Sequence, residues 1–333
     1  MPQWLVSLPD RLDTFLVSQH AFLSRAKAQA AIEAGSVAVN DDVILKSAHR
    51  LQEGDKVKVA TPLPTAGQSP IESVDLHLRL LYEDSSCAVI EKPAGIAAHP
   101  GSGMAPGEKT ILHGTVFLYG KWGLSFSEAS VLVHRLDRET TGCLLIAKHP
   151  EAHVRLQKQF ETRTVRKTYL ALVAGIPERQ TATIDAPIGR SNRDRTMMSV
   201  MGASAVREAQ TTYRVVATGA GNQESRMRNQ KLHSPFILHH SSHVSLLECD
   251  LHTGRTHQIR VHLSSIGHPV LGDGSYTSAL AQRLHQEYDI TILCLHAWKL
   301  AFVSPADGKE HQVTAPLPVA FREVLGRVGI GWR

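Results

Sequence analysis

The sequence predicts an α+β fold whose larger part is built on a mixed, largely antiparallel β-sheet. Three observations support this expectation. Apolar runs typical of strands recur between residues 87 and 303, candidate strands outnumber candidate helices, and the two do not alternate as in a doubly wound fold. A chain of 333 residues, 42% of them hydrophobic, exceeds one typical domain and can bury a substantial core.

Residues 1–60 are expected to form a small α/β-hairpin domain. A helix should run over 25–34, with Ser24 as its N-cap and Gly35 at its C′ position. The turn-prone trio 40–42 separates two short strand-like runs, which predicts a hairpin. A further strand is expected within 51–59.

A linker and a larger second domain should follow. Three prolines within residues 61–70 indicate the linker, which we place at 61–75, with the second domain at 76–333. The polar, basic and His-rich stretch 219–243 is interpreted as a surface insertion in that domain. The expected strands are 87–90, 143–147, 167–173, 211–216, 244–251 and 293–303, and the expected helices are 150–161, 253–264 and 318–328.

Charge and cysteine usage limit the class of protein. The formal charge is +5, but residues 1–60 hold seven cations and seven acids, whereas 148–167 hold six cations and two acids. Such a basic stripe is typical of proteins that bind a phosphate backbone, with ordinary solvated surface as the other interpretation. We expect no signal peptide at residues 1–10, and no apolar run approaches the roughly 18 residues needed to span a bilayer. The four cysteines lack Cys-x-x-Cys spacing, so we expect reduced thiols and a cytoplasmic protein.

Residues 134–142 form the most informative segment of the chain. The segment combines the carboxylate of Asp137 with flanking cations and hydroxyl groups, and the strand-like run 143–147 follows at once. A carboxylate at the mouth of a sheet is costly unless it is paired or used. The segment alone fits either a salt-bridged turn or an active site.

Four blocks in order extend this segment into a specific signal. They are Glu91-Lys92-Pro93-Ala94-Gly95 with His99-Pro100-Gly101; His134-Arg135-Leu136-Asp137 through Gly142; Arg166-Lys167-Thr168-Tyr169; and Thr253-Gly254-Arg255-Thr256-His257-Gln258-Ile259-Arg260-Val261-His262-Leu263 with Gly267-His268-Pro269 and Gly272-Asp273. In these blocks the chain resembles the RluA-type family of pseudouridine synthases. The N-terminal domain is similar to the alpha-L RNA-binding module first seen in ribosomal small-subunit protein four, on Arg11-Leu12-Asp13, Ser24-Arg25 and residues 35–40.

The resemblance implies an isomerase that converts uridine in RNA to pseudouridine without a cofactor. Asp137 is expected to start the reaction, either by covalent attack or as a base, and Tyr169 to line the uracil ring. The polar face of the helix 253–264 supplies Arg255 as the expected partner that keeps Asp137 ionised. The target base must be flipped out of its stack, and Arg135 is expected to fill the vacated space.

RNA is the expected partner, with large-subunit ribosomal RNA as the first candidate and transfer RNA as the second. We expect a monomer that binds neither DNA nor a membrane. No metal is expected, because His239, His240 and His243 lack a carboxylate or Cys partner. Besides the catalytic Asp137, Tyr169 and Arg255, the residues expected to bind substrate or RNA are His134, Arg135, Thr140, Lys167, Thr256, His257, Arg260, Arg25 and Lys27.

Two other functions stay open at this level. The first is an RNA-binding assembly factor without catalysis, against which the intact catalytic trio argues. The second is a hydrolase of glycosidic bonds, which needs a second acid placed apart from Asp137, and Glu139 is too near in the chain to flank a sugar. The chain departs from the family at Thr141, where Ser is usual, at Cys143, where an aliphatic residue is usual, and in the insertion 219–243, which leaves substrate choice open.

Overall fold

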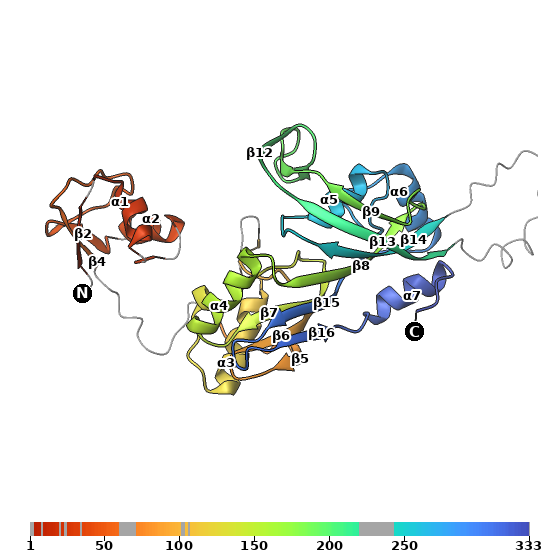
Figure 1. The fold of residues 1–333 in the computed structure, drawn as a ribbon, viewed down its shortest axis with the longest axis horizontal. Helices are drawn as coiled ribbons and strands as arrows, with labels where there is room; N and C mark the ends of the chain where they lie inside the picture. The colour runs from red at the N-terminus through yellow and green to blue at the C-terminus, as the bar shows by residue number, and fades with distance from the viewer. Residues whose placement is uncertain are drawn as a thin grey trace, which may run out of the picture. The chain divides into compact units, whose positions relative to one another are not determined.

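The computed structural model describes residues 3–7, 9–19, 21–22, 25–33, 35–59, 71–100, 104–105, 107–219 and 243–332, with only the backbone of Ala26 and Lys27. The chain forms two compact units, Met1–Pro70 and Ile71–Arg333 (Figure 1). The expected N-cap Ser24 and residues 220–242 of the expected insertion lie outside the described part.

The N-terminal unit combines two helices with a four-stranded antiparallel sheet in the order β1-β4-β2-β3. Its elements are β1 (Gln3–Leu5), α1 (Leu12–Ser18), α2 (Arg25–Glu33), β2 (Val37–Val39), β3 (Asp42–Val43) and β4 (Lys56–Val59). The predicted helix and hairpin are confirmed. Gly35 takes a φ of 74° directly after the helix, and Asn40 and Asp41 take φ of 52° and 73° in the hairpin turn, where Gly, Asn and Asp fit best. Strand β1 was not predicted.

The C-terminal unit is built on a long sheet in the order β5-β6-β7-β15-β8-β14-β13-β9, with β16 paired to β15. Within the described part of this sheet, β15 and β7 run parallel and the other neighbours antiparallel. This confirms the predicted α+β class. The strands are β5 (Arg79–Glu83), β6 (Cys87–Lys92), β7 (Thr141–Ala147), β8 (Arg166–Ala174), β9 (Thr181–Asp185), β13 (Gln210–Gly219), β14 (Val244–Leu251), β15 (Leu295–Val303) and β16 (Glu310–Thr314).

A small second sheet and several helices complete the unit. The small sheet has the order β11-β10-β12 and is formed by a hairpin-like excursion. Its strands are β10 (Ile188–Ser191), β11 (Met198–Ser199) and β12 (Ala203–Arg207), and the helices are α3 (Ile111–Trp122), α4 (Pro150–Glu161), α5 (Gln258–Ser265), α6 (Ala279–Glu287) and α7 (Val319–Arg327), with a 3-10 turn at Glu128–Ser130. Helices α3 and α4 lie at the β5–β7 end of the long sheet, and α5 and α6 at the β9–β14 end (Figure 1).

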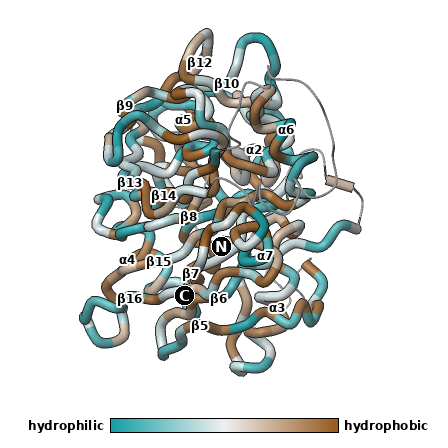
Figure 2. The backbone as a smooth tube through the Cα atoms, turned by 90° about the vertical axis from the view of Figure 1, so that its right-hand side faces the viewer, coloured by the Kyte–Doolittle hydropathy of each residue, from teal (hydrophilic) through white to brown (hydrophobic). Residues whose placement is uncertain are grey.

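The long sheet is buried on both faces. Along β8 the side chains alternate, so Tyr169 and Ala171 join one apolar cluster together with Ile259 of α5, whereas Leu170 and Leu172 join another that includes α6 and α7. Hydrophobic colour is concentrated along these central strands, while hairpin ends are hydrophilic (Figure 2). The four cysteines are buried and free, as expected. Tyr169 therefore faces the same side of the sheet as α5.

Helix α5 begins later than predicted. We expected a helix from Thr253, but residues 253–257 form a loop, and the helix starts at Gln258 after His257, which has a left-handed φ of 57°. The buried side chain of Gln258 explains the loop: its Oε1 accepts from the Thr253 hydroxyl at 2.7 Å and from the Arg255 N–H at 3.0 Å. These contacts fold the segment from Thr253 to Arg255 back onto the first helical residue, so it cannot continue the helix.

Candidate active site

The turn that carries Asp137 leads directly into β7. The Thr140 N–H donates to the Asp137 backbone carbonyl at 3.2 Å, which closes the turn before the strand starts. Behind it, Gly142 takes a φ of 112°, and a Cβ there would lie 2.2 Å from the Ala297 carbonyl oxygen of β15. Only glycine allows β7 and β15 to approach so closely at this point, which fixes where the Asp137 turn leaves the sheet.

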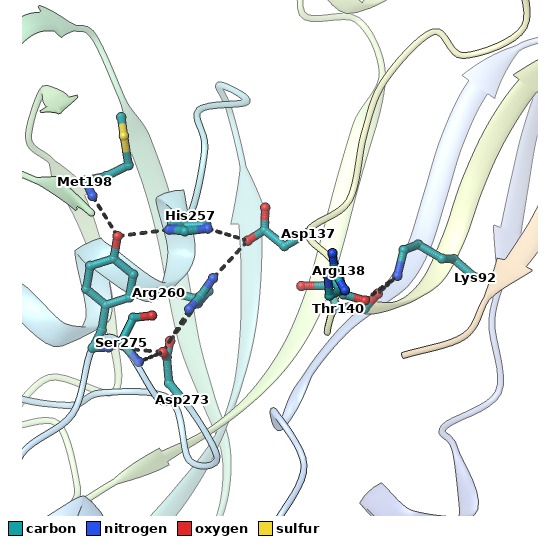
Figure 3. A network of polar contacts seen from close by, with 10 residues as sticks. Lys92, Asp137, Arg138, Thr140, Met198, His257, Arg260, Asp273 and Ser275 are labelled. Atoms are coloured by element: carbon teal, nitrogen blue, oxygen red, sulfur yellow. Dashed lines mark hydrogen bonds and ion pairs between the residues drawn. The ribbon is translucent and has the colours of Figure 1, made fainter. Parts of the chain in front are cut away.

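A buried lysine stabilises the backbone of this turn. Lys92, at the end of β6, is fully buried, and its Nζ donates to the carbonyls of Pro93, Arg138 and Thr140 at 2.8, 2.7 and 2.9 Å. Burial lowers the pKa of Lys92 to about 8. Figure 3 shows the ammonium directed at the strand-side carbonyls of the turn. Lys92 lies in the first of the four matching sequence blocks, but no role was predicted for it.

The cation that pairs with Asp137 is Arg260, and the predicted pairing with Arg255 is wrong. Arg260 Nη1 lies 3.4 Å from Asp137 Oδ2, whereas Arg255 Nε donates to the Glu208 carbonyl at 2.9 Å. The reason is the late start of α5, which leaves Arg255 in the loop. Arg260 is the third residue of α5, and its side chain reaches Asp137.

Arg260 is fixed by a carboxylate of its own. Its Nε and Nη2 donate to the two oxygens of Asp273 at 2.6 and 2.8 Å, the two-pronged geometry that suits a guanidinium. Asp273 is 0% exposed at its side chain and also accepts the N–H groups of Ser275 and Tyr276. Burial tends to raise the pKa of Asp273, but the Arg260 hydrogen bonds and charge outweigh it and lower that pKa. A rigid ion pair therefore presents the Nη1 group of Arg260 to Asp137.

Asp137 lines a cavity of about 470 Å³, a size typical of ligand pockets. The lining mixes apolar side chains with an excess of cations. It includes Leu136, Ile259, Leu251, Leu295, Tyr169, His134, Arg135, Thr140, Arg163, Lys167, Arg255, Thr256, His257 and Arg260, with Asp137 and Glu161 as the acids. Such a cavity can hold a planar apolar ring next to a carboxylate while cations meet a phosphate backbone.

Tyr169 and Lys167, both on β8, lie on the cavity wall, and their contact with substrate stays a prediction. Burial, together with the negative charge of Asp137, raises the pKa of Tyr169 well above its usual range, so its phenol stays neutral. Burial lowers the pKa of Lys167 to about 8. Tyr169 thus offers an uncharged ring, and Lys167 a cation whose charge is only weakly stabilised.

Two residues of the turn segment have internal partners. His134 Nε2 accepts the Leu145 N–H at 2.8 Å, and its ring stacks on Phe160 with centroids 4.7 Å apart. Burial lowers the pKa of His134 to about 3, so it is neutral and anchors the turn to β7. Thr140 is 2% exposed. By contrast, Arg135 and Thr256 are exposed at the cavity, where a substrate can reach them.

In the N-terminal unit the predicted RNA contact Arg25 is organised by a buried acid. Asp13, 0% exposed at its side chain, accepts from Arg25 Nε at 2.9 Å and from Arg11 Nη2 at 3.0 Å. The hydrogen bond from Arg11, opposed by burial, holds the pKa of Asp13 far below its usual range. The two guanidinium groups, 54% and 42% exposed, are thereby fixed at the surface. The side chain of Lys27 lies outside the described part of the chain.

The described residues also bear on metal binding and on membrane-spanning helices. Within the described ranges, no group of three or more His, Cys, Asp or Glu side chains could hold a metal ion. His239 and His240 lie outside those ranges. Among the described residues, no helix is both long and apolar enough to cross a bilayer.

Known proteins with similar sequence or structure share this architecture. The family described as RNA pseudouridylate synthase matches residues 86–265, and the S4 domain family matches residues 10–57. An uncharacterized RNA pseudouridine synthase of Bacillus subtilis is 33% identical over 95% of this chain and 93% of its own length. The ribosomal large subunit pseudouridine synthase D of Nitrosomonas europaea is 36% identical over 92% of this chain and 81% of its own. The structure of human RNA pseudouridylate synthase domain containing 1 matches 72% of this chain and 84% of its own, with 25% identity and a TM-score of 0.55.

Fold, cavity and sequence similarity together define an RNA pseudouridine synthase, which is an isomerase. More specifically, the chain belongs to the RluA family of RNA pseudouridine synthases and carries an N-terminal S4 RNA-binding domain. The predicted family and its RNA-binding module are confirmed.

Proposed function

We propose that this protein isomerises specific uridines of large-subunit ribosomal RNA, with Asp137 as the essential carboxylate. The observation that carries the proposal is the placement of Asp137: it opens into a cavity of about 470 Å³ beside a neutral tyrosine and an ion-paired arginine. Relatives named ribosomal large subunit pseudouridine synthase D, at 32 to 36% identity, support the choice of RNA.

The reaction breaks the bond from the ribose to uracil N1, turns the ring, and joins the ribose to uracil C5. The hydrogen at C5 leaves and N1 gains one, so atoms balance without an added reactant. Asp137 starts the reaction either by covalent attack or by removing a proton from the sugar, and both routes need the ionised carboxylate. Arg260 at 3.4 Å stabilises that charge.

The neighbours of Asp137 take supporting roles in this proposal. Tyr169 lines the flipped uracil ring as a neutral wall, because burial keeps its phenol protonated. Arg135, exposed at the cavity, replaces the flipped base in the RNA stack. Extrusion of the base costs a few kcal/mol, which contacts between the cations of the cavity rim and phosphates offset.

The test is a pseudouridine map of total RNA from the source cells with and without the gene, read by carbodiimide labelling and primer extension. Loss of sites in large-subunit ribosomal RNA, restored by the wild-type gene, supports the proposal. Sites lost in transfer RNA instead would replace the proposed substrate. An unchanged map together with an inactive purified protein would favour a binding protein without catalysis.

Asp137→Asn separates catalysis from binding. We expect this variant to restore no site and to release no tritium from RNA labelled at uracil C5, because its neutral amide can neither attack nor accept a proton. Its RNA affinity should stay close to wild type, because the amide has nearly the size and shape of the carboxylate it replaces. Glu139→Gln is the matched control, since Glu139 is exposed two residues away and should retain activity. Turnover by Asp137→Asn would remove Asp137 from the mechanism.

A further inference from the structure

A chain of polar contacts joins the small β10–β12 sheet to Asp137. The Met198 N–H of β11 donates to Tyr276 Oη at 2.8 Å, and Tyr276 Oη lies 3.0 Å from His257 Nδ1. The other ring nitrogen, His257 Nε2, lies 3.9 Å from Asp137 Oδ2. Figure 3 shows His257 placed between the Met198 side of the network and Asp137.

The hydrogen on the Tyr276 hydroxyl determines which nitrogen of His257 is protonated. Tyr276 is 6% exposed, so its hydroxyl hydrogen needs an acceptor inside the protein. Its oxygen already accepts from Met198, and among the described residues the acceptor within hydrogen-bond distance is His257 Nδ1. Nδ1 therefore carries the lone pair, and neutral His257 bears its hydrogen on Nε2, the nitrogen that faces Asp137.

The position of the His257 ring is strictly held. Its backbone adopts a φ of 57° directly before α5, a conformation that a non-glycine residue keeps only when its surroundings impose it. The ring meets Tyr276 edge-on, with centroids 5.6 Å apart. Tyr276 in turn packs its ring on the guanidinium of Arg260 at 5.1 Å. Both groups that approach Asp137 are thus supported by the same tyrosine.

His257 and Arg260 approach the same oxygen of the carboxylate. Both contacts end on Asp137 Oδ2, at 3.9 Å from His257 and 3.4 Å from Arg260, and in Figure 3 the second oxygen of Asp137 points away from both. A distance of 3.9 Å is too long for a hydrogen bond, so the contact in the free enzyme is electrostatic. Catalytic contacts of this kind tighten when substrate binds.

We propose that His257 is a positioning residue for the reaction: its Nε2–H, fixed by Tyr276, holds Asp137 Oδ2 together with Arg260 and leaves Oδ1 to react with the substrate. The proposal rests on the assignment of Asp137 as the reacting carboxylate. The hydrogen bond from Met198 to Tyr276 also connects the β10–β12 sheet, through His257, to the Asp137 carboxylate.

The pH dependence of turnover follows from the neighbours of His257. Asp137 from the turn before β7, Asp273 and Tyr276 from the segment before α6, Arg260 from α5 and Arg135 are the groups that face it. Burial, only partly opposed by Asp137, lowers the pKa of His257 below its ordinary 6.5. His257 is therefore neutral above that pH. Protonation below pH 6.5 puts a hydrogen on Nδ1 and displaces the hydrogen bond from the Tyr276 hydroxyl that fixes the ring, so the kcat profile should gain an acidic limb there.

Tyr276→Phe is the sharpest variant, because it removes the hydroxyl and keeps the ring on Arg260. We expect kcat to fall between about tenfold and about 100-fold with KM nearly unchanged. The acidic limb should move to higher pH, since Nδ1 loses the donor that stabilises neutral imidazole. His257→Asn, which tolerates the left-handed backbone, should lower kcat similarly and abolish the limb.

The control is Tyr119→Phe, which removes another buried phenol hydrogen bond, the one to the Ala147 carbonyl. Tyr119 is 1% exposed and does not line the cavity, so kcat and its pH profile should match wild type. If Tyr276→Phe and His257→Asn fold and both retain wild-type kcat, the proposal is wrong. If Tyr276→Phe does not fold, His257→Asn decides alone.

A spectroscopic measurement tests the tautomer without any activity. In protein with ¹⁵N-labelled histidine, the His257 signal, assigned by its loss in His257→Asn, should show hydrogen on Nε2 at pH 7.5, and Tyr276→Phe should shift it toward a tautomer mixture. Hydrogen on Nδ1 in the wild type would overturn the proposal. An active Asp137→Asn would instead overturn the assignment of Asp137, so the two failures can be told apart.

Discussion

At the residue scale, two buried cations act on different parts of the Asp137 turn. Lys92 binds backbone carbonyls of the turn, and Arg260 approaches the carboxylate itself. Lys92 donates to three carbonyls, and Arg260 donates to both Asp273 and Asp137. The position of Asp137 therefore depends on segments far away in the sequence.

Arg260→Lys should be much more damaging than its conserved charge suggests. A lysine cannot bind both oxygens of buried Asp273 and also reach Asp137. We expect kcat to fall about 100-fold, and the free energy of unfolding to fall by about 3 kcal/mol, measured by tritium release and urea denaturation. Arg255→Lys is the matched control, because Arg255 donates to one carbonyl and should lose far less. The reverse ranking would restore Arg255 as the partner of Asp137.

Lys92→Met should loosen the turn without touching the cavity. Three carbonyls lose their donor, so the free energy of unfolding at pH 7.5 should fall by about 3 kcal/mol. The pKa of Lys92 is about 8 in the folded protein and 10.5 for the free side chain, so the folded state binds fewer protons between these values. Wild-type stability from this residue should therefore rise from pH 8 toward 10.5. Urea denaturation across this range should show that rise in wild type and not in Lys92→Met.

The distinction between Arg255 and Arg260 shows the limit of sequence reasoning at this scale. Both arginines stand in one matching block, and both were expected near the substrate. The helix face alone favoured Arg255, because Gln258 was expected inside the helix, whereas it is the first helical residue and its side chain binds the preceding loop. The Arg260–Asp137 contact joins residues 123 apart, and no spacing in the chain encodes such a contact.

At the element scale, the close pairing of β7 and β15 sets the place of the active-site turn. Gly142→Ala puts a Cβ against the Ala297 carbonyl at 2.2 Å, on a backbone with a φ of 112°. Because both partners are backbone, relief needs the strands to separate. We expect a loss of at least about 3 kcal/mol in the free energy of unfolding, together with lower kcat, measured by urea denaturation and tritium release.

The control for that substitution is a glycine with free space. Gly120 lies within α3, and a Cβ there meets nothing within 4 Å. Gly120→Ala should raise the free energy of unfolding by about 0.5–1 kcal/mol, the usual gain in a helix interior, and leave kcat unchanged. Equal stability of the two variants would contradict the strand-contact argument.

Elements with strong local patterns were predicted, and those that depend on tertiary contacts were not. The helix Pro150–Glu161 and the strand Val244–Leu251 have the predicted bounds, because one starts with proline and the other alternates between apolar and polar residues as a strand does. Strand β12 was missed, since most of its residues are exposed and it gives no apolar alternation. Its sheet is anchored through Ile188, whose cluster includes Tyr276, a contact invisible in the sequence.

At the scale of the whole molecule, the S4 domain and the catalytic cavity belong to different units. The C-terminal unit, Ile71–Arg333, contains all residues that line the cavity. The S4 domain has equal numbers of acids and cations within residues 1–60, so its affinity for RNA depends on where its charges lie. Buried Asp13 fixes Arg11 and Arg25 at the surface, which concentrates positive charge in a domain that is neutral as a whole.

Removal of the S4 domain should therefore change binding and spare chemistry. A chain of residues 71–333 keeps its own apolar clusters and the complete cavity. At saturating RNA its kcat should equal that of the full chain, while its Kd should rise at least about tenfold and depend less steeply on salt, since fewer phosphates are neutralised. In the full chain, Arg25→Ala should raise Kd more than Lys58→Ala. Both side chains are ion-paired, but that of Arg25 is 54% exposed and held in place by buried Asp13, whereas that of Lys58 is 34% exposed and pairs with an exposed acid. An unchanged Kd for residues 71–333 would place RNA recognition in the C-terminal unit alone, whereas a lost kcat would show that the S4 domain takes part in catalysis.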